Sequence, residues 1–538
     1  MPDGNNHYRS DDCCDFQNLN VEAEAGLVPS VTPDEEGAAG ITLVRAVESA
    51  EATSNSSTPL SKRKVVMSLL WGGMEIYAGQ LLQFAIGIFL ARKLMPAQYG
   101  TIAIIGIFIQ LSQVFIDSGL PQALVRKKNV TSADLSTVFY TNMVVACICY
   151  ALIFFCAPAV GSFYADTDLT PALRVMGLCL IIGAVSGVMR TMLIKELAFK
   201  TLAIISLVAG VVSGITAIAM AYNGCGIWSL VAQNMLMTLV TSICIICLSP
   251  FRPKWLFSIK SLRELFGFGS KLLGSSIIWA VFGNIYTIVI GKALTPTALG
   301  YYSRADGYGR IVPANVSRLF TKVMFPVIAK IQDDNAKLNS LFTRSQSMTS
   351  FAVFGINCLL AGLAYPLVLN VISAKWLPCV PLLQIICIGA AFDPIAEING
   401  QFLIAKGYSG AFLKMHIITL PTKLILLAAT IWFGLIWIAV GRTVVAIVEW
   451  LISAYYFKKL TTISTRHFYL TAIKMGLTAT ATGLLGFFTF KLGLPPTWTN
   501  TIVVMLALVA LYIGAGMLLF RSTVTGSLHA CASIFRKA

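Results

Sequence analysis

Charged side chains are scarce in this chain. Aspartate, glutamate, lysine and arginine make up only 12% of its 538 residues, whereas a soluble domain carries about 25%. Hydrophobic residues make up 57%, and the mean hydropathy is +0.77. This composition excludes an ordinary globular domain. Apolar runs of about 20 residues, each long enough to cross about 30 Å of hydrocarbon, recur throughout and predict an all-α, polytopic membrane protein.

Histidine is also rare: the chain has four, and none accompanies the 13 cysteines at metal-ligand spacing. Cysteines such as Cys147 and Cys149 lie within apolar runs, where a thiol packs as a small hydrophobe. The sequence shows no nucleophile–base pair. We therefore expect no metal, no cofactor and no catalytic site, and the chain is predicted not to be an enzyme.

Fourteen apolar segments are predicted to be transmembrane helices. We expect residues 61–250 to form one six-helix bundle, residues 251–460 to form a second, and residues 461–538 to add two helices and a short basic tail. The predicted helices span 67–90, 99–120, 135–157, 172–189, 201–221, 226–248, 267–291, 298–326, 348–372, 380–404, 411–433, 435–457, 471–491 and 499–520.

Residues 1–60 differ from the rest, because they are acidic and lack periodicity. This predicts a disordered acidic cytosolic tail, or a chain that truly starts at Met67. The other bases orient the helices. If the amino terminus is cytoplasmic, most of them fall in cytoplasmic segments, as the positive-inside rule requires. Both termini are therefore predicted to be cytoplasmic. The bases on the outer side are then Arg92, Lys93, Arg174, Lys292, Lys375 and Lys491.

An internal repeat follows the first and the seventh predicted helices. Residues 92–100 (RKLMPAQYG) align without a gap with residues 292–300 (KALTPTALG), at an offset of 200. Both copies follow an odd-numbered helix, so the two halves are parallel repeats. Transporters commonly consist of such repeats, with the substrate site between the halves.

Six basic residues lie inside predicted membrane spans, where a charge is costly and tends to face a cavity. If they converge, they form a cationic cavity suited to an anion such as a diphosphate. The alternatives are that some snorkel to the interface, Lys271 and Arg318 above all, and that Arg310 pairs with Asp306 one turn away. The six bases, all in the second half, are Lys271, Arg304, Arg310, Arg318, Lys423 and Arg442.

Acidic residues also lie inside the predicted spans. Asp393 and Glu397 share one helix face, and Pro394 should break that helix. Together with Glu75 of the first helix, they are candidates for coupling to a proton or sodium ion. The alternative is that Asp393 and Glu397 mark the mouth of a span.

Five stretches occur in an order that resembles a known family: residues 118–128 (SGLPQALVRKK), 226–233 (GIWSLVAQ), 257–265 (FSIKSLREL), 299–305 (LGYYSRA, followed by Pro313) and 325–334 (FPVIAKIQDD). They resemble the polysaccharide flippases of the multidrug/oligosaccharidyl-lipid/polysaccharide exporter superfamily, most of all the colanic-acid exporter type. The resemblance covers residues 62–460. It implies two six-helix bundles around a central cavity, two extra helices, and a role for Arg304, which lies within a matching stretch.

The resemblance also implies a function. It implies that an undecaprenyl-diphosphate-linked oligosaccharide is moved across the bacterial inner membrane for surface polysaccharide synthesis. The expected partners are this anionic lipid, the bilayer, and a polysaccharide polymerase and glycosyltransferases; no nucleic acid is expected. One alternative is a cation-coupled multidrug exporter, although the excess of bases argues against it. The other is a membrane-bound polysaccharide polymerase or ligase, although such enzymes usually carry a large periplasmic loop, and all outer connections here are short.

Overall fold

The computed structural model of the chain describes residues 62–127, 130–249, 251–331, 334–461 and 466–521. Every regular element within these ranges is a helix, which confirms the all-α class. The acidic tail predicted at residues 1–60 and the basic end at 522–538 lie outside the described residues.

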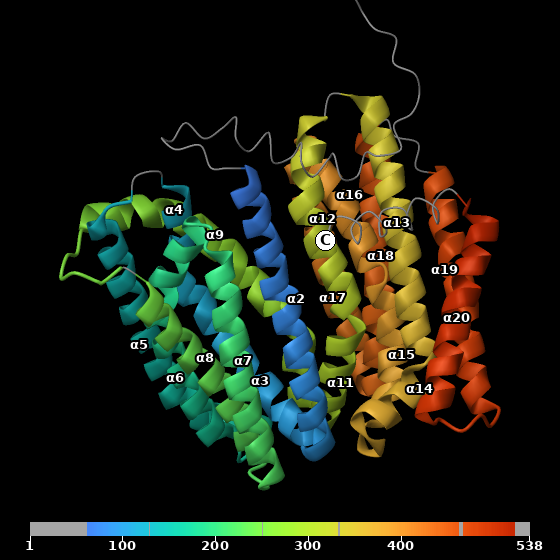
Figure 1. Cartoon of the computed structure of the whole chain (residues 1–538), viewed down its shortest axis with the longest axis horizontal. Helices are drawn as coiled ribbons and strands as arrows, with labels where there is room; N and C mark the ends of the chain where they lie inside the picture. Colours follow the sequence, from blue (N-terminus) through green and yellow to red (C-terminus); the bar gives the residue numbers. More distant parts are fainter. Residues whose placement is uncertain (1–61, 128–129, 250, 332–333, 462–465, 522–538) are drawn as a thin grey trace, which may run out of the picture.

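The first half of the chain forms seven helices, drawn from blue to green in Figure 1. Gln98, at the third position of α3, accepts a hydrogen bond from the Met95 N–H, and Pro96 occupies the first turn. Ser118 and Gly119 then adopt left-handed backbone conformations that separate α3 from α4. The helices are α2 (Lys62–Lys93), α3 (Pro96–Asp117), α4 (Leu120–Arg126), α5 (Ser132–Tyr164), α6 (Leu169–Lys195), α7 (Phe199–Tyr222) and α8 (Ile227–Leu248).

The second half is also helical, and its helices are interrupted more often. Its elements are α9 (Ile259–Gly283), α10 (Ile285–Ala293), α11 (Pro296–Gly309), α12 (Ile311–Lys330), α13 (Asn335–Gly362), α14 (Ala364–Leu367), η1 (Val368–Ile372), η2 (Ala374–Trp376), α15 (Cys379–Ala390), α16 (Asp393–Ala405), α17 (Ser409–Thr430), η3 (Ile431–Phe433) and α18 (Leu435–Leu460). Two further helices, α19 (Arg466–Lys491) and α20 (Trp498–Leu519), follow and pack beside α13.

Each of the fourteen predicted segments coincides with one helix or with consecutive helical segments. Among the described residues, eleven helices are long and apolar enough to cross a membrane, or up to twelve if α13 and the segment Ala364–Ile372, bent by 67°, form one span. The multi-pass membrane fold is therefore confirmed, and the number fourteen stays a prediction. Large apolar side chains on the outer surfaces of these helices are exposed, as Phe155, Ile425 and Leu506 show; in a membrane, hydrocarbon would cover them.

The helices gather into two groups that lie side by side in Figure 1. In the first, α2 packs on α7, α5 on α6, and α8 on both α6 and α7; in the second, α15 packs on α11, α13 and α18, and α17 packs on α18. The groups meet where α3 crosses α11, at the bottom of the view. Although α9 follows the expected boundary at residue 250, it packs against α3, α4 and α5 of the first group. The division into two bundles at that boundary stays a prediction.

Two faces of the molecule are used below. The inner face carries α4 and the start of α9, at the top of Figure 1, and the base distribution predicts that it is cytoplasmic. The outer face carries the two repeat motifs, residues 92–100 and 292–300.

Candidate functional site

Two predicted membrane spans of the second half carry charged residues where their helices are interrupted. One interruption lies between Gly309, the end of α11, and Ile311, the start of α12. The other lies between Ala390, the end of α15, and Asp393, the start of α16. The interruption at Asp393 agrees with the disturbance expected at Pro394. At about 1.5 Å per residue, Arg310 and Asp393 each lie about 21 Å along their spans. Interrupted helices of this kind commonly build transporter sites.

Ion pairs join these interruptions. The Arg310 guanidinium lies 3.2 Å from the Asp393 carboxylate and 4.0 Å from that of Asp306. Arg442 of α18 donates from Nε to Asp306 Oδ1 at 3.1 Å. The pair expected between Asp306 and Arg310 therefore exists, but each residue lies closer to a partner on another helix. The four charges cancel, so these two arginines are not an uncompensated cationic surface.

A third acid, Glu449 of α18, also has basic neighbours, both on α17. Glu449 lies 3.9 Å from the Lys423 ammonium and 3.9 Å from His416 Nδ1. Glu397, expected to share a site with Asp393, instead accepts a hydrogen bond of 2.6 Å from Gln401 on its own helix. Lys423, like Arg310 and Arg442, is thus placed beside a carboxylate.

Arg304 has a different environment. Its guanidinium carbon lies 3.8 Å from the centre of the Tyr99 ring of α3 and 5.9 Å from that of Tyr308. Arg304 also lies near α2, because a Cβ added at Gly87 of that helix would lie 3.8 Å from Arg304 Nη1. Arg304 therefore lies where the two groups meet. Within the described residues no carboxylate forms an ion pair with it.

The side chains of two other predicted site residues lie outside the described part of the structure. Lys271 belongs to α9 and Glu75 belongs to α2; their proposed roles stay predictions. Arg318, expected to snorkel, is exposed on α12.

The two copies of the repeat motif face each other across the outer contact. A Cβ added at Gly100 would lie 2.7 Å from the carbonyl carbon of Pro296, and one added at Gly300 would lie 2.6 Å from that of Pro96. Since ordinary carbon contacts begin near 3.5 Å, only glycine allows α3 and α11 to approach so closely. The sequence repeat is therefore also a reciprocal contact in space.

The first base of each motif reaches into the opposite half. Arg92 donates to the carbonyls of Asn370 and Val371 at 2.7 and 2.8 Å, and Lys292 donates to the carbonyl of Phe163 at 2.6 Å. The two halves are thus joined twice, once in each direction.

An aromatic residue completes the outer contact. Trp376 is fully buried and donates from Nε1 to the Ala91 carbonyl at 2.8 Å. Its ring packs edge-on against Tyr99 and Tyr301, with centroids 5.4 and 6.0 Å away. Lys375 adds a hydrogen bond of 2.9 Å to the Arg92 carbonyl. In this structure the outer ends of the two halves are closed against each other.

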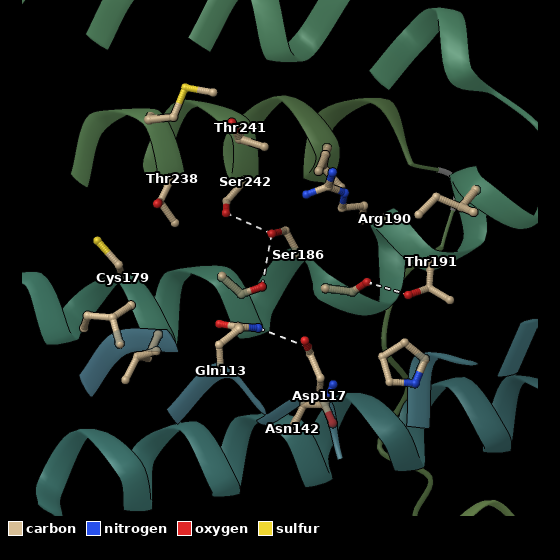
Figure 2. Close-up of a pocket in the computed structure, with 18 of the residues that line it drawn as sticks. Gln113, Asp117, Asn142, Cys179, Ser186, Arg190, Thr191, Thr238, Thr241 and Ser242 are labelled. Atoms are coloured by element: carbon tan, nitrogen blue, oxygen red, sulfur yellow. Dashed lines mark hydrogen bonds between the residues drawn. The ribbon is translucent and has the colours of Figure 1, made fainter. Parts of the chain in front are cut away.

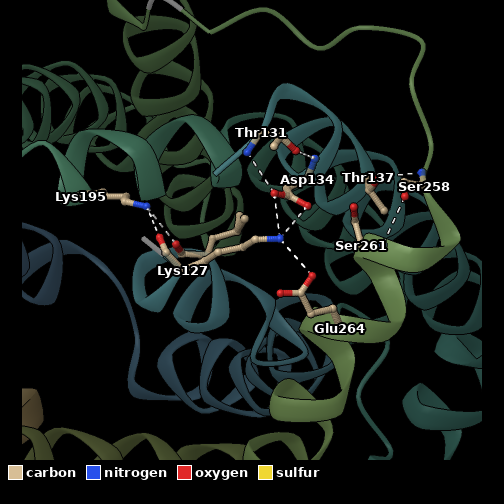
Figure 3. A network of polar contacts seen from close by, with 9 residues as sticks. Lys127, Thr131, Asp134, Thr137, Lys195, Ser258, Ser261 and Glu264 are labelled. Atoms are coloured by element: carbon tan, nitrogen blue, oxygen red, sulfur yellow. Dashed lines mark hydrogen bonds and ion pairs between the residues drawn. The ribbon is translucent and has the colours of Figure 1, made fainter. Parts of the chain in front are cut away.

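A polar network on the inner face ties α9 to the first half (Figure 3). Lys127, at the end of α4, lies 3.1 Å from both Asp134 and Glu264. Burial would lower the pKa of Lys127, but hydrogen bonds to these two carboxylates outweigh it and raise that pKa above its usual value. Asp134 also caps α5, because it accepts from the Thr131 N–H at 3.0 Å.

The backbone before α9 joins the same network. The Ser258 N–H donates to Thr137 Oγ1 at 3.0 Å, and the Lys254 N–H donates to Ser136 Oγ at 3.1 Å. The ion pair between Lys127 and Glu264 makes neighbours of two stretches that resemble the family's, residues 118–128 and 257–265.

Comparisons with known proteins agree with this architecture. Residues 89–381 match the family described as "Polysaccharide biosynthesis protein". The chain is 25% identical to the teichuronic acid biosynthesis protein TuaB of Bacillus subtilis, over 70% of this chain and 78% of that protein. It is also 25% identical to the lipopolysaccharide biosynthesis protein WzxC of Escherichia coli, over 61% and 67%.

Solved structures show the same fold. The lipid II flippase MurJ, in an inward closed conformation, has a TM-score of 0.67 at 15% identity, covering 85% of this chain and 100% of MurJ. An inward-facing multidrug resistance MATE family transporter has a TM-score of 0.52 at 18% identity, covering 71% and 95%.

Proposed function

The chain belongs to the family of polysaccharide biosynthesis proteins, which matches residues 89–381, and on that basis we propose that it is a flippase for a lipid-linked oligosaccharide. The substrate would be an undecaprenyl-diphosphate-linked oligosaccharide that crosses the bacterial inner membrane toward the periplasm. The names of TuaB and WzxC support a role in surface polysaccharide synthesis, and the shared fold with MurJ supports a flippase architecture.

The observation that carries the proposal is the environment of Arg304. A charged group within a membrane is costly and is usually neutralised. The arginines at 310 and 442 have carboxylate partners, whereas within the described residues no carboxylate pairs with Arg304. Its planar fork of donors suits a diphosphate. Its position between the halves would place that diphosphate where both halves can contact it.

Alternating access follows from the contacts at the outer face. Rocking of the halves about a central site is the common motion of transporters built from repeats. The reciprocal contact of the repeat motifs would close the outer face while substrate enters from the inner face. Separating Gly100 from Pro296 and Gly300 from Pro96 would open the outer face for release.

The test is export of polysaccharide by a strain that lacks the gene and carries variants of it. Arg304→Ala should abolish export. Arg304→Lys should allow only partial export, because lysine keeps the positive charge but lacks the planar guanidinium donors that can bind two phosphate oxygens at once. Arg174→Ala is a matched control. Arg174 also lies over an aromatic ring, 4.4 Å from the centre of Phe154, but on the side of the first half. Normal export by Arg304→Ala, at equal protein levels in the membrane, would contradict the proposal.

The drug-exporter alternative predicts acids that are available to a cationic substrate. At the helix interruptions Asp306 and Asp393 are each paired with an arginine, which disfavours it. Coupling of Asp393, Glu397 or Glu75 to an ion stays a prediction. A cytoplasmic location for both termini and association with a polymerase and glycosyltransferases belong to the same proposal.

A further inference from the structure

A pocket lies within the first half, and Arg304 is not among the residues that line it. It has a volume of about 630 Å³ and opens among α3, α4, α5, α6, α7 and α8, near the inner face (Figure 2). This volume is in the range of small-molecule sites. The polar lining residues that decide which ligand it could take are Gln113, Asp117, Asn142 and Arg190.

One residue that lines this pocket carries an unpaired acceptor. Asn142 is only 3% exposed, yet no donor among the described residues reaches its Oδ1. An unpaired buried acceptor costs about 1–3 kcal/mol. The Oδ1 atom is itself covered, so a ligand hydroxyl would donate to it after the Asn142 amide turns its oxygen toward the pocket, and that hydrogen bond would remove the cost. Asp117 accepts a hydrogen bond of 3.0 Å from Gln113 Nε2, and a carboxylate has capacity for several.

The mixture of groups decides the class of ligand. A diphosphate would meet Asp117 as well as Arg190, so these two side chains together offer it no net positive charge. A metal ion would face the positive charge of Arg190, which lies close enough to Asp117 for the two charges to interact, and the described residues contain no group of three or more metal-ligating side chains. A hydrocarbon tail would offer no hydrogen bond to Asn142 Oδ1 or to the carboxylate of Asp117, which is unfavourable.

A sugar fits all of these groups, because each hydroxyl both donates and accepts. Its hydroxyls can donate to Asp117 and Asn142 and accept from Arg190. We propose that this pocket is a sugar subsite, which takes a glycosyl unit of the lipid-linked substrate on the inner face. The inference rests on the proposed function and adds to it: Arg304 would select the diphosphate, and the pocket around Asn142 would select the sugar.

The test is lipid binding by the full chain in nanodiscs. The probes are undecaprenyl diphosphate without a sugar and the same lipid carrying glucose, galactose or N-acetylglucosamine. The wild-type protein should bind at least one glycosylated probe more tightly than the bare diphosphate. Asn142→Leu and the isosteric Asp117→Asn should each weaken that binding about tenfold, the effect of one or two hydrogen bonds, and leave binding of the bare lipid unchanged.

Ser229→Ala is the matched control. Ser229 is fully buried in the first half, and its hydroxyl has no hydrogen-bond partner within the part of the chain that the structure describes, but it does not line the pocket. The sugar subsite is overturned if the wild-type protein binds all four probes equally, or if both pocket variants keep the preference for the glycosylated lipid. If the wild-type protein binds none of the probes, the proposed function fails, and the subsite fails with it.

Discussion

The contact between the two repeat motifs can be tested with a single methyl group. A Cβ at Gly100 would lie 2.7 Å from the Pro296 carbonyl carbon, about 0.8 Å inside an ordinary contact. The neighbouring atoms belong to the backbone of Pro296, so rotation of a side chain cannot relieve the clash. We therefore expect Gly100→Ala to push α3 and α11 apart and to disfavour the closed outer face.

The size of this effect follows from known costs of overpacking. An extra carbon in a well-packed contact typically costs 1–3 kcal/mol, which corresponds to about a 5- to 150-fold change in the ratio of two conformations. Gly300→Ala should act in the same direction, because its Cβ would meet the backbone of Pro96 at 2.6 Å. The two substitutions change the same contact, so their effects should not add fully.

Hydrogen–deuterium exchange of the purified full chain measures the shift. In Gly100→Ala, peptides covering residues 92–101, 292–301 and 370–377 should take up deuterium faster than in the wild-type protein. Gly106→Ala and Gly307→Ala are controls on the same two helices, because a Cβ at either position has no neighbour within 4 Å. Unchanged uptake at the outer face in both Gly100→Ala and Gly300→Ala would refute the reasoning.

Two further predictions concern charged groups. Arg310→Ala should lower the free energy of unfolding by about 1–3 kcal/mol, because it leaves Asp393 without its nearest partner. In a thermal-shift assay, adding Asp393→Ala should recover part of this loss of stability. A larger loss in the double variant than in Arg310→Ala would contradict the pairing. On the inner face, Glu264→Gln should cost only about 0–1 kcal/mol, because the Glu264 side chain is 60% exposed. Asp134→Asn should cost more, because Asp134 is buried and caps α5; equal melting temperatures would argue against the network as described.

Much of the architecture could be predicted from the sequence, because the membrane imposes a simple rule. Backbone groups in hydrocarbon must bond within a helix, so apolar runs predicted helices at all fourteen positions. Pro394 predicted the break before α16. The offset of 200 predicted a duplication, and the structure adds that the copies Pro96–Gly100 and Pro296–Gly300 contact each other.

The partners of the membrane charges could not be predicted in the same way. Spacing along one helix suggested that Arg310 pairs with Asp306, but the closer partner, Asp393, comes from a helix more than 80 residues later. Which helices pack together depends on tertiary contacts that periodicity does not encode. The stacking of Arg304 on Tyr99 was missed for the same reason, although Tyr99 lies within the repeat motif.

The attachment of α9 to the first half bears on how the two halves would move. The second bundle is predicted to begin at residue 251 and to include α9, yet Lys127 and Thr137 hold the start of that helix on the first group. If the halves rock as bodies, the chain must bend after this anchor, and the interruption between Gly283 and Ile285 supplies the place. The predicted boundary between the bundles, near residue 250, would then not be the place where the chain bends. The hinge would lie some 30 residues farther along the chain.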